Sequence, residues 1–437
     1  MEIPTSFRVA AHPSVMWRCL MTRSLAPFFS LFLSTAILLL GDGLFGTLLP
    51  IRGSLNGFSA TSLGLMGSAY FAGYMLGALF GPAGIMRVGH IRSFAVFASI
   101  ASAAPLAHML FSDPVAWVVL RVATGFCIAG LYMIIESWLN EQATNSNRGT
   151  VFAVYRVVSL AALTLGQLAL NLFDPGGFEL FAVVAILTSF ALVPVSLTTA
   201  VQPAPLETAR VKLSELWSIS PVGVMGCFIV GLVNGPFWAL GPVYAREVGL
   251  DIQGVSFFMT LAILGGALLQ VPVGRLSDRI DRRWVLIFVL AGVTLTAAYL
   301  SLAPGQVGTS GIYLGAFAFG AFALSLYGLC VAQANDHAAP HQFVLVASGL
   351  TLVFAVGAMT GPLAISGLIP LFGIGSVFAL SAASSGLFIL FVLARILARE
   401  AVPEDEKEDF VAVPISQTTA APLELDPRAE GDEATQS

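Results

Sequence analysis

The length, composition and charge of the chain exclude most classes of soluble protein. It has 437 residues, of which 57% are hydrophobic and only 10% are charged, whereas an ordinary soluble domain carries about 25% charged residues. The last 40 residues hold 11 of the 25 acidic side chains, so the net charge of −5 describes this tail. The apolar body has too few cations to neutralise a phosphate backbone, and we expect no nucleic-acid partner.

Twelve apolar segments follow one another along the chain. A membrane helix needs about 20 mostly apolar residues to cross the hydrocarbon of a bilayer. Segments of that length, separated at charges and at Gly/Pro clusters, predict an all-α membrane protein with the lipid bilayer as its surroundings. The predicted spans are 27–49, 62–85, 93–111, 115–137, 150–172, 178–200, 221–243, 255–274, 284–303, 311–333, 344–368 and 373–397.

A polar break divides these spans into two groups of six. Residues 201–220 combine prolines with charged side chains and predict a cytoplasmic central loop between an N-terminal six-helix bundle, 27–200, and a C-terminal one, 221–397. Residues 1–26 carry three arginines but no apolar stretch with a cleavage site, which predicts a cytoplasmic N-terminal segment and not a signal peptide. The acidic tail, 398–437, is too poor in apolar residues to fold and is predicted to be disordered.

The distribution of lysine and arginine predicts the orientation, because these residues are retained on the cytoplasmic side. With a cytoplasmic N-terminus, sixteen of the 20 cationic residues face the cytoplasm and only Arg52 and Arg246 face the other side. We therefore expect a multi-pass protein of the cell inner (plasma) membrane with both termini in the cytoplasm.

An internal repeat relates the two groups of spans. Asp42-Gly43-Leu44-Phe45 in the first span corresponds to Asn234-Gly235-Pro236-Phe237 in the seventh, at a displacement of 192 residues. The same displacement places Arg87 on Arg279 and His90 on Arg282. Because one shift aligns both helices and loops, it predicts a duplicated six-helix unit.

Two motifs resemble those of the major facilitator superfamily. The loop Gly274-Arg275-Leu276-Ser277-Asp278-Arg279-Ile280-Asp281-Arg282-Arg283 is similar to the G-x-L-x-D-R-x-G-R-R signature, with Asp281 where the pattern has glycine. Arg121-Val122-Ala123-Thr124-Gly125 is similar to the R-x-x-x-G element of the fourth span. The resemblance covers about residues 27–397.

This resemblance implies two pseudo-symmetric six-helix bundles that expose a central site to one side of the membrane at a time. It also implies a single working subunit, no cofactor, and a cytoplasmic gate. The first-half loop has Met86 opposite Asp278, so we expect the gate to rest on the second copy. The expected gate residues are Gly274, Asp278, Arg279, Arg282 and Arg283.

Four ionisable residues lie inside predicted spans: Asp42, Arg121, Glu136 and Arg156. Such a residue costs about 2.5–3.5 kcal/mol at a helix centre, so it usually faces a cavity or a partner. Asp42, between two glycines, is the candidate proton site, with hydrogen bonding between helices as the alternative; its repeat counterpart Asn234 does not ionise.

Arg121 is expected to hold a substrate carboxylate or to pair with Asp42 or Glu136, and the resemblance links it to proton coupling. A structural ion pair, or snorkelling to the interface, is the alternative for Arg121 and for Arg156. For Glu136, proton transfer competes with a gate-locking pair to Arg148 or Arg156.

Polar residues recur with one spacing in the fourth and fifth spans. Intervals of 11 and 15 residues place them within about 60° on a helix. These stripes predict a polar path between two neighbouring helices. The stripe of the fourth span contains Arg121, Tyr132 and Glu136, and that of the fifth contains Arg156, Gln167 and Asn171.

Aromatic residues supply the hint of a ligand. Rings within the predicted spans suit a flat heterocycle, although membrane aromatics more often pack or anchor at the interface. They belong to Tyr70, Tyr74, Tyr132, Tyr155, Phe237, Trp238 and Tyr327. Asp336, His337 and His341 lack a further ligand nearby, and Pro340 interrupts a helix there, so we expect no metal site.

These patterns predict a secondary active transporter that works by alternating access on a small-molecule substrate, driven by protons. Proton-driven exporters of the superfamily usually carry Gly-Pro near the middle of span five, where this chain has Leu165-Gly166-Gln167-Leu168. That departure favours import by symport. The two arginines and the aromatic residues suit an aromatic or weakly anionic nutrient, with an aromatic vitamin such as riboflavin as the candidate substrate. Efflux by proton antiport, a passive facilitator and a transport-like sensor are the alternatives. The sequence contains no cluster typical of an enzyme.

Overall fold

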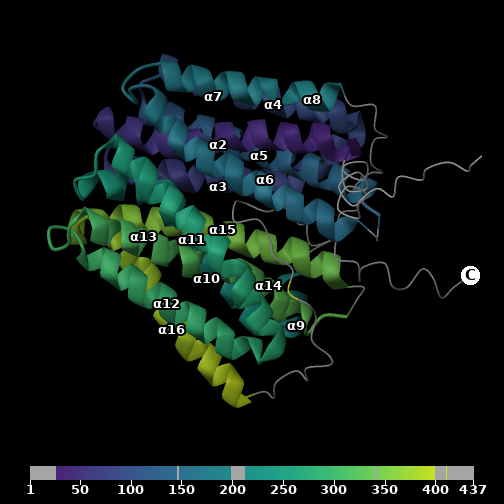
Figure 1. The fold of residues 1–437 in the computed structure, drawn as a ribbon, viewed down its shortest axis with the longest axis vertical. Helices are drawn as coiled ribbons and strands as arrows, with labels where there is room; N and C mark the ends of the chain where they lie inside the picture. Colours follow the sequence, from purple (N-terminus) through teal and green to yellow (C-terminus); the bar gives the residue numbers. More distant parts are fainter. Residues whose placement is uncertain (1–25, 145–146, 198–211, 340–341, 399–409, 411–437) are drawn as a thin grey trace, which may run out of the picture.

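The computed structural model describes residues 26–144, 147–197, 212–339, 342–398 and 410. Within these residues, twelve helical segments are long and apolar enough to cross a membrane, which confirms the twelve predicted spans. The helices of the first half, purple to blue, lie beside those of the second half, green to yellow (Figure 1). Most of the predicted N-terminal segment, and all of the acidic tail except Ala398 and Phe410, lie outside the described residues.

The helices extend several residues beyond most predicted spans. The elements are η1 (Ala26–Phe28), α2 (Phe29–Leu55), α3 (Ala60–Val88), α4 (His90–Leu110), α5 (Pro114–Gln142), α6 (Arg148–Ala169), η2 (Leu170–Leu172), α7 (Glu179–Phe190), α8 (Leu192–Ser196), α9 (Leu213–Ile219), α10 (Pro221–Glu247), α11 (Ile252–Arg279), α12 (Arg282–Leu302), α13 (Thr309–Ala323), α14 (Leu326–Asn335), α15 (Phe343–Phe372) and α16 (Ser376–Ala398). We call the face where α2 begins and α16 ends the terminal face, and the other the opposite face.

Two predicted spans are interrupted. The sixth divides into α7 and α8 at Ala191, whose carbonyl accepts a 2.5 Å hydrogen bond from the Ser34 hydroxyl of α2. Pro194 follows within α8 and has no N–H to continue the helical ladder. The tenth span divides into α13 and α14 at Leu324 and Ser325, where the Ser325 hydroxyl donates to the Ala321 carbonyl at 2.7 Å. Such back-bonding competes with the backbone ladder and bends helices.

The helix boundaries repeat at the displacement found in the sequence. Helices α2 and α10 both have 27 residues and α4 and α12 both have 21, with each pair displaced by 192 residues at both ends. The Arg246 guanidinium donates to the Ser54 hydroxyl at 3.1 Å, and these two residues are also 192 apart. Because each touches its own counterpart, the pseudo-two-fold axis passes between them at the opposite face.

Glycines set the closest helix contacts in both halves. A Cβ atom on Gly73 of α3 would lie 2.0 Å from the Val122 carbonyl oxygen of α5. On Gly265 of α11, the counterpart of Gly73, it would lie 2.1 Å from the Phe317 carbonyl oxygen of α13. Each pair therefore packs backbone against backbone, as small residues allow membrane helices to do.

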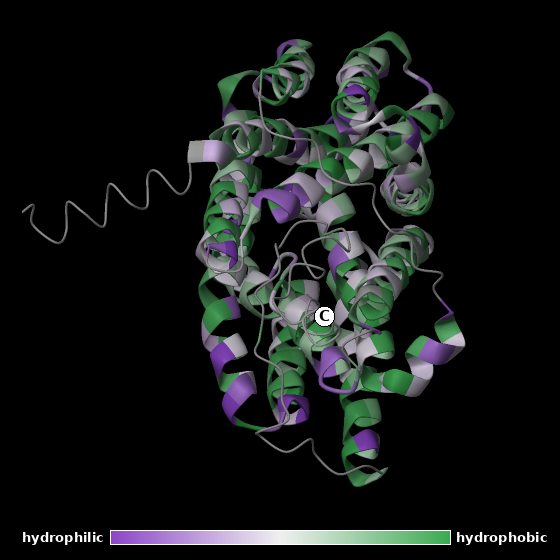
Figure 2. Cartoon of the chain, turned by 90° about the vertical axis from the view of Figure 1, so that its right-hand side faces the viewer, coloured by the Kyte–Doolittle hydropathy of each residue, from purple (hydrophilic) through white to green (hydrophobic). Residues whose placement is uncertain are grey.

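The outer surface of the described helices is apolar. Large side chains such as Leu110, Leu314 and Leu387 are 68–79% exposed, and Figure 2 shows helices that are mostly hydrophobic, with short hydrophilic stretches. An exposed apolar surface of this extent requires a nonaqueous partner. Together with the twelve spans, it identifies a multi-pass membrane protein.

Candidate functional site

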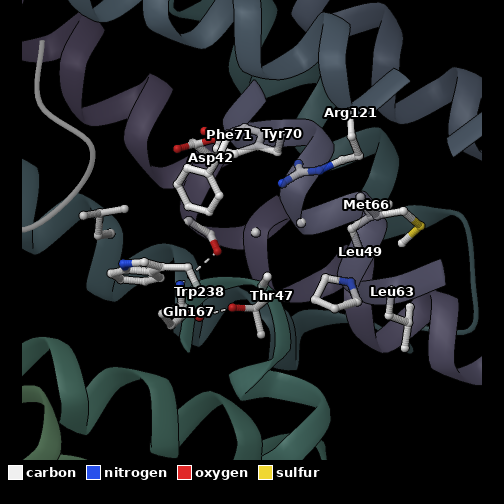
Figure 3. A pocket seen from close by; sticks show the side chains of 16 residues that line it. Asp42, Thr47, Leu49, Leu63, Met66, Tyr70, Phe71, Arg121, Gln167 and Trp238 are labelled. Atoms are coloured by element: carbon white, nitrogen blue, oxygen red, sulfur yellow. Dashed lines mark hydrogen bonds between the residues drawn. The ribbon is translucent and has the colours of Figure 1, made fainter. Parts of the chain in front are cut away.

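A cavity lies where the two halves meet. Helices α2, α3, α5 and α6 of the first half and α10 of the second line it, and its empty volume, with the space at its mouth, is about 750 Å³ (Figure 3). The lining residues are Asp42, Gly43, Gly46, Thr47, Leu49, Pro50, Leu63, Met66, Gly67, Tyr70, Phe71, Arg121, Leu163, Gln167, Trp238 and Ala239.

Asp42 lies at the middle of α2, and its carboxyl group is partly exposed to the cavity. The Tyr132 hydroxyl of α5 donates to its Oδ2 atom at 3.1 Å. The next residue, Gly43, brings α2 against α6, since a Cβ there would lie 3.1 Å from the Leu163 carbonyl oxygen. The sequence-predicted proton site is therefore accessible to the cavity and held by one neutral donor.

Arg121 extends from α5 toward the aromatic rings of the cavity (Figure 3). Its guanidinium carbon lies 4.1 Å from the centroid of the Tyr70 ring and 5.8 Å from that of Phe45. Within the described residues it forms no ion pair, although its charge interacts electrostatically with Asp42. Arg121 is instead a cation that two ring faces support without neutralising. Its role in holding a substrate carboxylate stays a prediction.

A group of buried tyrosines connects the cavity with Glu136. The Tyr155 hydroxyl of α6 donates to Glu136 Oε1 at 3.0 Å, and both residues are buried away from the cavity lining. Tyr74 of α3 has a buried hydroxyl without a hydrogen-bond partner among the described residues. Electrostatically it interacts with both Asp42 and Glu136. The Tyr74 hydroxyl is therefore within electrostatic range of both carboxyl groups.

The polar stripe of α6 serves contacts to other helices. Arg156 donates to the Gln270 amide oxygen of α11, and the Asn171 amide donates to the Ser256 hydroxyl of α11 at 3.1 Å. Gln167 donates to the Gly43 carbonyl of α2 at 3.0 Å and accepts a hydrogen bond from Thr47.

Of the three stripe residues only Gln167 lines the cavity. The backbone of α6 packs against α2 and α11, and that of α5 packs against α3 and α4. Within their described residues, the fourth and fifth helices are therefore not packed directly against each other along their length. Their stripes each supply one residue to the cavity lining, Arg121 and Gln167, and the polar path between them stays a prediction.

The predicted aromatic pair separates into a lining residue and a core residue. Trp238 is partly buried, lines the cavity and packs against core residues of both halves. Phe237 is 1% exposed, and its ring centroid lies 5.5 Å from that of Phe319 and 6.4 Å from that of Phe258. Asn234 is also buried and outside the lining, and its Oδ1 atom has no partner among the described residues.

The expected gate residues form a charged cluster on the second half. Arg282, with a side chain 1% exposed, pairs with Asp336 at 2.7 Å and with Asp278 at 3.3 Å. Arg283 pairs with Asp281 at 2.9 Å, whereas Arg279 is exposed. We call Asp278, Arg282 and Asp336 the buried charge triad after its two buried side chains, those of Arg282 and Asp336; the Asp278 side chain is 30% exposed.

Gly274 belongs to another contact at the same end of the half. The ring of Phe410 packs over it, at 2.1 Å from the position of an added Cβ. The backbone N–H of Phe410 donates to Asp278 Oδ1 at 2.9 Å. Gly274 thus provides the space in which a residue of the acidic tail meets the buried charge triad.

Sequence reasoning missed several of these residues. Nothing in the motif indicated Asp336 as the partner of Arg282, or Phe410 as a neighbour of Gly274. For the cavity wall of α3 a signal existed, since its apolar lining residues recur at intervals of three and four, as on one face of a helix. The residues missed there are Leu63, Met66, Gly67 and Phe71, whereas Tyr70 was among the aromatic residues that the sequence indicated.

The fold and the site define a class of protein. Two related six-helix halves surround a partly polar cavity at their junction, which is the arrangement expected of a membrane transporter with internal repeats.

The comparisons with known proteins show the family. The sequence profile of the Major Facilitator Superfamily matches residues 31–249 and 223–425. The chain belongs to this superfamily of transporters. It is 26% identical over 373 residues to "Uncharacterized MFS-type transporter YcaD" of Escherichia coli O6:K15:H31 (strain 536 / UPEC), with 84% of this chain and 95% of the relative covered.

Solved structures confirm the predicted fold. The nucleoside transporter NupG superimposes with a TM-score of 0.74 at 12% sequence identity, covering 84% of this chain and 99% of NupG. A D-xylose–proton symporter superimposes with a TM-score of 0.64 at 17% identity, covering 86% of this chain and 97% of the symporter. At these identities the likeness concerns the fold alone.

Proposed function

We propose that this protein is a proton-coupled secondary active transporter that imports a small organic solute by alternating access. In this proposal the bundles 27–200 and 221–397 rock about the central cavity, and one subunit is sufficient. Neither a cofactor nor an enzymatic step is needed, because the proton gradient supplies the energy.

The observation that carries the proposal is that Asp42 and Arg121 line the same cavity but do not form an ion pair with each other. Asp42 is accessible and held by the Tyr132 hydroxyl, so its carboxyl group is able to gain or lose a proton. Arg121 offers its charge to a ligand. An ionisable group that faces a membrane cavity is a functional candidate by default.

Contacts at the two faces support alternating access. At the opposite face, Arg246 and Ser54 connect the halves on the pseudo-two-fold axis. Toward the terminal face, Arg156 and Gln270 connect α6 with α11. In the proposed cycle such contacts break on one side while the other side stays closed. The buried charge triad stiffens the second half at the terminal face, where the Arg156–Gln270 contact forms part of the proposed gate.

The orientation, direction and substrate are parts of the same proposal. The excess of cationic residues predicted for the terminal face supports a cytoplasmic location of that face in an inner membrane. The rings of Tyr70, Phe71 and Trp238 support a solute with a flat aromatic body. Riboflavin is the first compound to test, and proton-driven export is the competing direction.

Transport in proteoliposomes tests this function. Purified protein is reconstituted with a pH-sensitive dye inside, and aromatic solutes are added on each side with and without an imposed proton gradient. We expect inward solute movement to carry protons and a protonophore to abolish accumulation. Solute movement that is independent of the gradient would overturn proton coupling, and accumulation driven only outward would overturn import.

A further inference from the structure

Three arginines of the first half are held by neutral groups. Arg52 donates to backbone carbonyls at 3.2 and 3.5 Å, Arg156 donates to the Gln270 amide, and Arg121 lies over the ring of Tyr70. In the part of the chain that the structure describes, none of the three has an ion-pair partner. Of these three cations, Arg121 is the one that lines the central cavity.

The charge of the cavity depends on one proton. Among its lining residues, Asp42 and Arg121 are the two side chains that carry a full charge near neutral pH. When Asp42 is ionised, the lining has no net charge. When Asp42 carries a proton, the lining has a net charge of +1, carried by a guanidinium with five N–H donors.

We propose that the transported solute is a small aromatic monocarboxylate, held by Arg121 and bound together with a proton on Asp42. This inference rests on the proposed function and specifies its substrate class. A carboxylate at Arg121 is repelled by an ionised Asp42 in the same low-dielectric cavity, and the proton removes that repulsion. By linkage, the anion and the proton each strengthen the binding of the other.

We place the transported proton on Asp42 after comparing it with the other titratable groups nearby. On α5 they are Arg121 and Tyr132, and on α3 the titratable groups are Tyr70 and Tyr74. The lining residues of α6 and α10, and the residues of α7 that pack on Gly41, do not titrate. Glu136 lies outside the cavity lining, interacts electrostatically with Tyr74 and accepts a hydrogen bond from Tyr155.

The remaining lining residues determine the shape and polarity of the part of the solute that does not contact Arg121. Tyr70 and Phe71 of α3 and Trp238 of α10 place aromatic rings around the cavity, and leucine, methionine and proline side chains fill the spaces between them. Rings that flank a cation suit a flat apolar body with one carboxylate. The neutral riboflavin is then a weaker ligand than an aromatic acid.

Isothermal titration of the full-length protein in detergent tests this inference. The probes are benzoate with benzamide and phenylacetate with phenylacetamide, two pairs that differ chiefly in charge. We expect each acid to bind at least about tenfold more tightly than its amide, as a charge-assisted hydrogen bond would provide. Titrations in two buffers of different ionisation enthalpy should show uptake of close to one proton per bound acid above pH 7.

Matched variants locate the two charges. Arg121→Gln should weaken binding of the acids about 10- to 100-fold, and Arg121→Lys should restore part of it. Asp42→Asn should still bind the acids but without proton uptake and without pH dependence. Arg52→Gln removes a cation outside the central lining and should leave binding unchanged.

Each remaining outcome overturns the inference. Equal binding of acid and amide, failure of both acids to bind at millimolar concentration, or acid binding that survives Arg121→Gln would refute the anionic substrate class. Proton uptake that persists in Asp42→Asn would refute the linkage. These results are independent of transport, so an acid-selective protein that fails to accumulate solute in vesicles would refute only the proposed function.

Discussion

The two halves of this protein share a backbone plan and differ in their charges. Helices α2 and α10 have the same length. Gly73 and Gly265 make equivalent helix contacts, where an added Cβ would lie 2.0 and 2.1 Å from a carbonyl oxygen of the neighbouring helix. Yet Asp42 in the first half corresponds to Asn234 in the second, which does not titrate and lies outside the cavity lining. The helices of the two halves therefore pack symmetrically, whereas the ionisable residue of the cavity is present in the first half alone of this pair.

The same displacement shows how each half uses its charge. In the tenth span the packing shifts the displacement to 195, since Val122 and Phe317 carry the carbonyl oxygens that meet Gly73 and Gly265, so Tyr132, the donor to Asp42, corresponds to Tyr327. The Tyr327 hydroxyl shares a 3.2 Å hydrogen bond with the Thr351 hydroxyl, and Asn234 Oδ1 has no partner among the described residues. In the other direction, the triad member Arg282 corresponds to His90. The first half carries unpaired charge in the cavity, and the second carries paired charge near the terminal face.

The largest expected effect separates Asp42 from its counterpart. Asp42→Asn should abolish gradient-driven accumulation but spare solute exchange, because exchange does not require the carrier to release a proton. Asn234→Ala should accumulate solute as the wild type does, because Asn234 does not titrate and lies outside the cavity lining. Uptake and counterflow in proteoliposomes measure both properties. Accumulation by Asp42→Asn would mean that the first half does not hold the coupling site.

The next largest effect is a loss of stability that distinguishes Arg282 from its counterpart His90. Arg282→Gln leaves Asp336, whose side chain is 3% exposed, without its 2.7 Å ion pair. Breaking a buried ion pair costs about 3–5 kcal/mol, and we expect a loss of this size in the free energy of unfolding, measured in detergent. His90→Gln and the exposed-site control Arg279→Gln should cost far less. Equal losses in all three variants would contradict the distinction between the halves.

A smaller effect tests the symmetry itself. Gly73→Ala and Gly265→Ala each push a methyl group against a carbonyl oxygen of the neighbouring helix, and overpacking of this kind typically costs about 1–3 kcal/mol. Because the two contacts are equivalent, we expect the losses of unfolding free energy to agree closely. Gly84→Ala is the matched control, since an added Cβ there meets nothing within 4 Å. A loss confined to one variant would show that the halves do not pack alike.

The smallest expected effect lies on the pseudo-two-fold axis. Ser54→Ala removes the acceptor of the 3.1 Å hydrogen bond from Arg246, a bond worth about 0.5–1.5 kcal/mol. If this bond helps to close the opposite face, the variant should shift the population toward opening on that side. Labelling of a cysteine placed at Ala239 in the cavity reports this accessibility. An unchanged labelling rate would show that this hydrogen bond does not contribute to closing the opposite face.

Local pattern determined much of the architecture. Span length and hydrophobicity were sufficient to predict twelve helices, because a bilayer accepts only segments of about 20 apolar residues. One displacement was sufficient to predict the duplication. The accessibility of Asp42 and Arg121 was also predictable, because an isolated charge in an apolar helix needs a cavity or a partner.

The partners of the charges were not predictable in this way. Spacing along α6 predicted a path with α5, but α6 packs against α2 and α11, so Asn171 and Arg156 bond across the junction of the halves. Adjacency in the sequence does not specify which helices of a bundle touch. Likewise, Phe237 and Trp238 are neighbours in the chain, but their directions differ by about 100° on a helix, and only Trp238 lines the cavity.

The sequence by itself determined the membrane class, the number of spans, the repeat and the ionisable residues that required an explanation. These properties follow from composition and from periodicity along one dimension. Only the tertiary structure decided that Arg121 lies over the ring of Tyr70 in the cavity that it shares with Asp42, and that Arg282 pairs with Asp336, 54 positions away. Side-chain pairing depends on distance in space, which the packing of the helices sets.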